Sequence, residues 1–275
     1  MMQGHEMERL CSLFFELSNE DRLRIILTLM DRPLKLTHIA KELDLTAQEC
    51  SRQLSRLTDI DLVTKNPEGA FMLQPYGRHA FRLFPGFQFL TEHVEYFNRH
   101  SLTGLPEKFM GRIGELRGCK PVTEIMGTMA NIERMIRESE EYFVFMTKET
   151  LATAHAINLS REALDRGIIE RGIELTSYVR PDDIVKGVPK ETWDATHVHR
   201  TNGLLTNRYL EEIDVTIYMN EKEVAILAFP DEQGGFDYLG FTSEDQKIHD
   251  WCLELFNHYW DDAIPWEKHV GYPRY

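Results

Sequence analysis

The sequence lacks the features that mark several common classes of protein. Its four cysteines, spread over 275 residues, form no CxxC pair, so they predict neither a disulfide scaffold nor a cysteine-based zinc site. No apolar run approaches the roughly 20 residues that a membrane-spanning helix needs. The N-terminus, MMQGHEMERLCSLFF, has no basic start before an apolar core, so we expect no signal peptide. These absences favour a cytoplasmic protein with reduced thiols and no membrane partner.

Motifs for common catalytic chemistry are also missing. The sequence contains no GxGxxG, P-loop, GxSxG or HExxH pattern. We therefore expect no cofactor and no enzymatic activity. An enzyme housed in the C-terminal part of the chain, with the N-terminal part as a protein-contact module, is the alternative hypothesis.

Basic charge is scarce and unevenly distributed. The net charge is −14, which argues against non-specific binding of nucleic acid by the whole surface. Residues 1–98 carry 11 Lys and Arg against 14 Asp and Glu, whereas residues 99–275 carry 20 against 31. The N-terminal part is close to neutral, so a local basic face there can still meet phosphates.

What the N-terminal part does contain is a run of short helix signals. Apolar spacing predicts helices over residues 6–17 and 18–32, the second capped by Ser18 and ended by Pro33. Thr37 is predicted to cap a third helix. Thr46 and Glu49 have capping-box spacing, which predicts the start of a fourth helix that buries Cys50, Leu54 and Leu57.

Two short strands are predicted next, over residues 62–65 and 70–73, joined by a type I turn at Asn66-Pro67-Glu68-Gly69. Two helices followed by a hairpin are typical of a winged helix-turn-helix that binds double-stranded DNA. The small side chain of Ala40 allows the two helices to approach closely. The side chains predicted to contact DNA are Thr46, Gln48, Ser51, Arg52, Gln53, Ser55, Arg56, Lys65 and Asn66. The alternatives are a helical bundle with solvated arginines and a winged helix that binds protein.

The next segment is helical and rich in aromatic residues. Residues 76–98 read as helix with an interruption at Pro85-Gly86, and the pattern breaks at 101–106. The aromatic set comprises Phe81, Phe84, Phe87, Phe89, Tyr96 and Phe97. Either it packs against a second subunit, which gives a homodimer, or it packs against the first helix of the same chain.

The remaining pattern alternates between strand and helix. Residues 142–146 read as a buried strand, 160–171 as a helix ended by Gly172, and 173–179 as the next strand. Three strands follow over 214–241, and Ser243 is predicted to cap a last helix. We therefore predict an α+β protein with a winged helix-turn-helix at 1–75, a helical linker or dimerisation segment at 76–105, and a mixed α/β sheet domain at 106–275.

Candidate effector contacts lie in this last domain. Arginine forks suit an anionic small molecule, which points to Arg180 and Arg200. His197 and His199 can place two imidazoles on one face of a strand, but zinc needs further ligands that the neighbouring sequence does not offer. The two histidines are also explained as polar strand or loop positions, and the two arginines as partners of the acidic residues that are abundant in this domain. We predict no metal.

Two segments resemble known families. FFELSNEDRLRIILTLMDRPLKLTHIAKELDLTAQECSRQLSRLTDIDLVTK resembles the winged helix of archaeal ArsR-like regulators. IDVTIYMNEKEVAILAFPDEQGGFDYLGFTSEDQKIHDWCLELFNHYWDDA resembles the methanogenesis-regulatory family found with such winged helices. The resemblance implies a homodimeric transcriptional regulator of energy or methanogenesis genes. It also implies a phospholipase-D-like sensor fold, and because the chain lacks HxKxxxxD, that likeness favours binding over catalysis.

Overall fold

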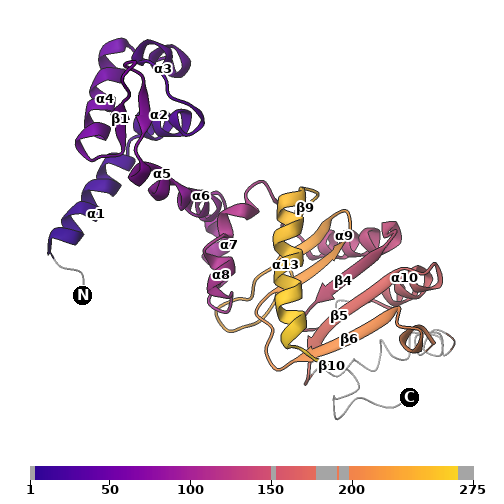
Figure 1. The fold of residues 1–275 in the computed structure, drawn as a ribbon. Helices are drawn as coiled ribbons and strands as arrows, with labels where there is room; N and C mark the ends of the chain where they lie inside the picture. The colour runs from indigo at the N-terminus through magenta and orange to yellow at the C-terminus, as the bar shows by residue number, and fades with distance from the viewer. Residues whose placement is uncertain (1–3, 150–152, 178–190, 192–197, 266–275) are drawn as a thin grey trace. The chain divides into compact units, whose positions relative to one another are not determined.

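The computed structural model describes residues 4–149, 153–177, 191 and 198–265. The chain divides into two compact units, Met1–Phe84 and Pro85–Tyr275. A winged helix-turn-helix occupies the first and a mixed α/β sheet the second, which confirms the fold class predicted from the sequence (Figure 1). The division falls at Phe84, earlier than the pattern break at 101–106. Within the described ranges, no helix has both the length and the apolar character needed to cross a bilayer.

The first unit follows the predicted order of helices and hairpin. Its elements are α1 (Gly4–Leu17), α2 (Glu20–Asp31), α3 (Leu36–Leu43), α4 (Ala47–Asp59), β1 (Val63–Lys65), β2 (Phe71–Leu73) and α5 (Pro75–Arg82). Two predicted caps are wrong by one or two residues. Asn19, rather than Ser18, caps α2 by accepting a hydrogen bond from the Arg22 backbone N–H at 3.1 Å. Lys35 precedes α3 and makes no side-chain cap, so Thr37 lies inside the helix.

The core of this unit is built from the predicted apolar faces. Ile25, Ile26 and Leu29 of α2 pack with Ile39 of α3 and with the buried side of α4. α5 approaches the hairpin closely at Gly77, where an added Cβ would lie 2.5 Å from the backbone oxygen of Leu62. Only glycine permits this approach without a backbone shift.

The second unit begins with short helices and continues into the sheet. Its elements are α6 (Phe84–Glu92), α7 (Val94–Phe97), α8 (Glu107–Met110), the 3₁₀ helix η1 (Ile113–Leu116), β3 (Lys120–Val122), α9 (Ile125–Glu138), β4 (Tyr142–Met146), α10 (Ala154–Asp165), β5 (Ile169–Leu175), β6 (Leu205–Leu210), β7 (Thr216–Asn220), β8 (Val224–Ala228), β9 (Gly240–Ser243), α13 (Gln246–Asp262) and β10 (Ile264–Pro265). The described strands form a sheet in the order β10-β6-β5-β4-β7-β8-β9-β3.

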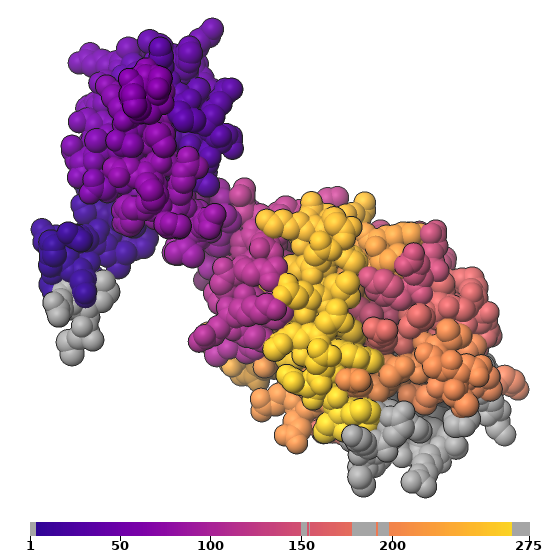
Figure 2. Space-filling view, in the orientation of Figure 1, coloured from indigo at the N-terminus to yellow at the C-terminus, as the bar shows by residue number. Residues whose placement is uncertain are grey.

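Helices cover both faces of this sheet. β4, β5 and β6 run parallel, and the remaining neighbours pair antiparallel. α9 and α10 pack on one face, while α13 packs on the other together with α6, α8 and η1 (Figure 1). In the space-filling view α13 runs along the surface of the unit as a continuous band (Figure 2). Its buried side includes Trp251 and Phe256, which are fully enclosed.

One helix and strand of this unit lie earlier than the sequence pattern predicted. The predicted helix at 160–171 is wrong: α10 ends at Asp165, and Gly167, with φ of 90°, makes the turn. Gly172, predicted to end the helix, lies within β5, where the Phe145 ring occupies the space that a Cβ would need. Ser243 does not cap α13 either, because Asp245 accepts the backbone N–H groups of the first turn.

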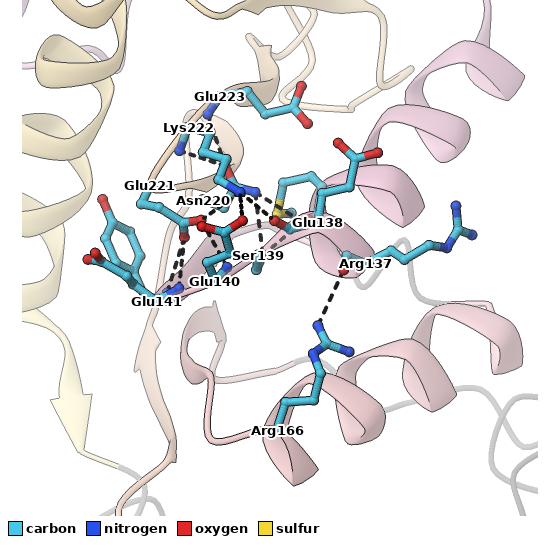
Figure 3. Close-up of polar contacts among 12 residues, drawn as sticks. Arg137, Glu138, Ser139, Glu140, Glu141, Arg166, Asn220, Glu221, Lys222 and Glu223 are labelled. Atoms are coloured by element: carbon cyan, nitrogen blue, oxygen red, sulfur yellow. Dashed lines mark hydrogen bonds and ion pairs between the residues drawn. The ribbon is translucent and has the colours of Figure 1, made fainter.

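The turn between β7 and β8 shows how acidic residues serve the fold (Figure 3). The Asn220 side-chain oxygen accepts the backbone N–H groups of Lys222 and Glu223, each at 2.9 Å. The Glu221 carboxylate accepts the backbone N–H groups of residues 140–142 at 2.9 to 3.3 Å. Burial raises the pKa of Glu221, but these donors outweigh it and the pKa falls below its usual value. The Glu221 carboxylate therefore serves to hold the turn between β7 and β8 against the start of β4.

Candidate nucleic-acid interface

The start of α4 is fixed by a tight turn and a reciprocal cap. Asp44 adopts the left-handed conformation, with φ of 56°, and ends α3. The Thr46 hydroxyl accepts the Glu49 backbone N–H at 3.2 Å, and the Glu49 carboxylate accepts the Thr46 backbone N–H at 3.0 Å. The predicted capping box is confirmed. Hydrogen bonds from Thr46 also lower the pKa of the Glu49 carboxyl.

Replacing Thr46 with alanine should lower the stability of α4 by about 1 kcal/mol, because the cap satisfies an otherwise unpaired backbone donor. Hydrogen exchange of the α4 amides in the full chain measures this. Thr37→Ala is the matched control, since Thr37 is exposed and lies within α3 rather than at its cap. Equal protection loss in both variants would show that the cap contributes nothing specific.

The two sides of α4 differ sharply in exposure. Its buried side contains Cys50, Gln53, Leu54 and Leu57. Its outward side carries the exposed Gln48, Ser51, Arg52 and Ser55. Burial raises the pKa of the Cys50 thiol, which disfavours the thiolate that a metal would bind. Within the part of the chain that the structure describes, no three His, Cys, Asp or Glu residues are placed to hold a metal ion.

Gln53 does not lie on the outward side, and that prediction is wrong. It is only 5% exposed, and its side-chain oxygen accepts a hydrogen bond from Arg22 Nη1 at 2.9 Å. The sequence pattern did not predict this buried hydrogen bond. Gln53 is polar and is therefore predicted to lie on the outward side, while its partner, Arg22, belongs to the buried and otherwise apolar stripe of α2. A charged residue on a stripe otherwise made of Ile25, Ile26 and Leu29 was the available signal.

Arg56, also predicted to contact DNA, already has a partner within the fold. It is partly exposed, but its guanidinium pairs with the carboxylate of Glu16, at the end of α1, rather than standing free. Nε lies 2.9 Å from Glu16 Oε2 and Nη2 lies 2.7 Å from Oε1. The hydrogen bonds with Glu16 raise the pKa of Arg56. Sequence reasoning missed both Glu16 and this pair.

The neighbouring helix braces α4 as the sequence pattern predicted. Ile39, Ala40 and Leu43 of α3 are buried in the same core as the inner side of α4. Ala40 is among the buried residues, in keeping with its expected role as the small side chain at the helix crossing.

The hairpin forms the predicted wing. β1 and β2 pair antiparallel, and Leu34 adds an isolated bridge to Phe71. The turn is closed by a hydrogen bond from the Gly69 backbone N–H to the Asn66 carbonyl at 3.0 Å, with Gly69 at φ of 79°. The Asn66 side-chain oxygen accepts the Ala70 backbone N–H at 2.8 Å, so part of this side chain serves the turn. Lys65 is exposed, with Nζ 4.8 Å from the centre of the Phe71 ring.

The predicted effector contacts are only partly described. Arg180 and His197 lie outside the described residues. Residues 198–201 are helical rather than a strand. His199 Nε2 lies 2.8 Å from Asp165 Oδ1, which gives that imidazole a partner within the fold. Arg200, beside it, is partly buried.

The aromatic segment packs almost entirely within the chain. Phe81 and Phe84 join the core of the first unit, which also includes Leu13. Phe89, Tyr96 and Phe97 join the core of the second. Only Phe87 of the set is exposed, at 56%.

A larger exposed apolar stripe lies on α1. Met7, Leu10 and Phe14 follow one another at helical spacing and are 47%, 36% and 52% exposed. Cys11 is exposed one turn from Met7, and Phe15 is 61% exposed beside the stripe. The N-terminal half of α1 stands clear of the other elements of its unit (Figures 1 and 2).

The helix-turn-helix region matches a known family. Residues 19–65, which run from the cap of α2 to the end of β1, match the family described as "Bacterial regulatory protein, arsR family". None of the curated proteins matches the chain significantly.

Several solved structures of low sequence identity align with the chain. TrmBL2, an archaeal chromatin protein, is 16% identical over 95% of this chain and 99% of its own, with a TM-score of 0.41. NUC from Salmonella typhimurium, a phospholipase D family member, is 9% identical over 50% of this chain and 90% of its own, with a TM-score of 0.33. The methyltransferase SibL is 11% identical over 72% and 62%, with a TM-score of 0.27. At these TM-scores the likenesses establish no shared activity.

Proposed function

From the arsR-type helix-turn-helix domain that its N-terminal unit carries, we propose that the protein is a sequence-specific transcriptional regulator that reads double-stranded DNA with α4. The observation that supports this most is the division of α4 into a buried side and an outward side of short polar and basic side chains. A helix of this kind fits the major groove, which is about 12 Å wide.

The outward side chains suit base and phosphate recognition. Arg52 can take guanine through its two-pronged guanidinium, and Gln48 can take adenine. Ser51 and Ser55 can donate to bases or to phosphates. Lys65 on the wing and Thr46 at the start of α4 are proposed to contact phosphates of the DNA. We propose a smaller contribution from Asn66, because its side-chain oxygen is engaged in the turn.

The charge distribution restricts how DNA is bound. The chain has a net charge of −14, so most of its surface repels a duplex. We propose that contact is confined to α4 and the wing and that non-specific binding is weak at physiological salt.

We propose that the protein is a homodimer held by the exposed stripe of α1. A two-fold dimer presents two recognition helices to half-sites roughly 34 Å apart. A soluble monomer rarely leaves a stripe such as Met7, Leu10 and Phe14 in water, and a second copy covers it with an identical surface. This assignment replaces the aromatic segment, of which only Phe87 is exposed.

The second unit is proposed to respond to a small-molecule effector. Arg180, His197 and Arg200 stay as proposed contacts for an anionic molecule, whereas His199 is paired with Asp165. We propose further that the protein controls energy or methanogenesis genes in an archaeon. The resemblance of the C-terminal segment alone supports this.

A second candidate function is a winged helix that binds protein. It is favoured by the acidic residues Glu49, Asp59 and Glu68, which are exposed on or near α4 and the wing and reduce the attraction of this surface for phosphates. A protein partner with a basic surface would suit them.

Selection of random duplexes by the full chain separates the two functions. The proposed function predicts an enriched motif with two related half-sites. If the second unit responds to an effector, adding cell metabolites should change how much of the selected DNA the protein retains. A pool that stays random after repeated rounds would contradict DNA reading and favour the protein-binding candidate.

A further inference from the structure

Glu16 of α1 makes a two-pronged ion pair with Arg56 of α4, the proposed recognition helix. Its Oε2 accepts from Arg56 Nε at 2.9 Å and its Oε1 accepts from Arg56 Nη2 at 2.7 Å. The Glu16 side chain is only 10% exposed, whereas that of Arg56 is 42% exposed. Paired geometry of this kind is stronger and more directional than a single contact between charges.

Arg22 holds Glu16 in place from the other side. Arg22 is buried, and its Nε donates to the Glu16 backbone oxygen at 2.6 Å and lies 3.2 Å from the carboxylate. Its Nη1 donates to Gln53, so the same guanidinium reaches α1 and α4. The Glu16 carboxylate therefore lies between two arginines, and the pKa of Glu16 is lowered, chiefly by the hydrogen bond from Arg56.

Releasing Arg56 to a phosphate would leave this arrangement incomplete. Glu16 would remain in a largely buried position with one cation fewer, and a buried charge that loses a partner is costly. Phe15 adds to the hold on Arg56, because the guanidinium carbon lies 5.4 Å from the centre of its ring. Arg52, one turn earlier on α4, is exposed and forms no ion pair among the described residues.

We propose that Glu16 is a positioning residue that holds the Arg56 side chain against α1 and away from DNA. The helix α4 then presents a single arginine, Arg52, to the duplex. The inference rests on the proposed function. It assigns the two arginines of the recognition helix to different tasks: Arg52 reads DNA, and Arg56 ties the recognition helix to the helix with the proposed dimer stripe.

The salt dependence of binding counts phosphate contacts and tests this directly. The slope of log K against log salt concentration changes by about 0.9 for each contact. The full chain and its variants are titrated with one duplex obtained by selection. Arg56→Ala should leave the slope unchanged. Arg52→Ala should make the slope shallower if Arg52 contacts a phosphate. If Arg52 contacts a base instead, Arg52→Ala should weaken binding equally at every salt concentration.

Glu16→Gln is expected to act in the opposite direction. It removes the charge that holds Arg56, so the slope should steepen by about 0.9 as Arg56 gains a phosphate. The double variant Glu16→Gln with Arg56→Ala should return to the slope of the unmodified chain. Thermal unfolding of each variant checks the fold, and the Arg56→Ala arm stands even if Glu16→Gln fails to fold.

Two results would overturn the inference. One is a shallower slope for Arg56→Ala in the presence of Glu16, which would place Arg56 on the DNA. The other is a folded Glu16→Gln variant whose slope is unchanged. Absence of any binding by the unmodified chain is a different result, because it contradicts the proposed function itself.

Discussion

Replacing Phe14 with glutamate is expected to convert the protein from a dimer into a monomer and to lower its affinity for a two-half-site duplex by roughly two to four orders of magnitude, the range in which linked binding sites exceed single ones. Phe14 is 52% exposed on α1, so the fold should tolerate a charge there. In a dimer the same position would be covered, and an unpaired carboxylate would be desolvated at the interface. Analytical ultracentrifugation measures the mass.

Phe87→Glu is the matched control for this prediction. Phe87 is 56% exposed and belongs to the second unit. If α1 forms the interface, Phe87→Glu stays dimeric. Dissociation of Phe87→Glu with an intact Phe14→Glu dimer would instead assign the interface to the aromatic segment.

A chemical readout is available for the same interface. Cys11 is the exposed cysteine, whereas Cys50, Cys119 and Cys252 are buried. Because Cys11 lies one turn from Phe14, a short bis-maleimide should link two copies through it. Phe14→Glu should abolish this product.

Replacing Arg52 with alanine is expected to weaken binding to a selected duplex by about 1 to 3 kcal/mol while leaving unfolding unchanged, because one good contact between a side chain and a base has that value. Arg52 is exposed on the outward side of α4 and supports no part of the core. Fluorescence anisotropy at fixed salt concentration measures the loss.

Arg24→Ala provides the control, since it removes the same charge from an exposed position on α2. A loss for Arg52→Ala alone indicates a specific contact. Equal losses for both variants would reduce the role of Arg52 to general electrostatics, and no loss for either would contradict the placement of DNA on α4.

The first unit was largely predictable because its structure depends on local signals. The capping box of Thr46 and Glu49 and the Gly69 turn act within a few residues, and the apolar spacing of α4 matches its buried side. The caps of α2 and α3 were misplaced because several adjacent residues are suitable caps and the choice among them depends on packing.

The second unit was predicted less well because its strands depend on distant partners. β3, β6 and β10 were missed; β3 and β10 are short edge strands that pair with β9 and β6. The sequence pattern predicts a helix end at Gly172 because glycine commonly ends helices. Its actual role, making room for the Phe145 ring of the neighbouring strand, depends on a contact that no local pattern contains.

The candidate site shows the same limit. Exposure of Gln48, Ser51, Arg52 and Ser55 followed from helical periodicity. The pairing of Arg56 did not, because Glu16 lies 40 residues away along the chain. Helical periodicity identifies most of the outward side of α4, but it places the buried Gln53 there, and it does not reveal which charges on that side are already neutralised.

Site-specific crosslinking of α4 to DNA tests the central claim most directly. A photoreactive residue, p-benzoylphenylalanine, is placed in the full chain at Gln48 and, as a control, at Arg24, both of which are exposed. We predict that a selected duplex is captured from position 48 and not from position 24. Capture from position 24 with none from position 48 would contradict the claim that the outward side of α4 enters the groove.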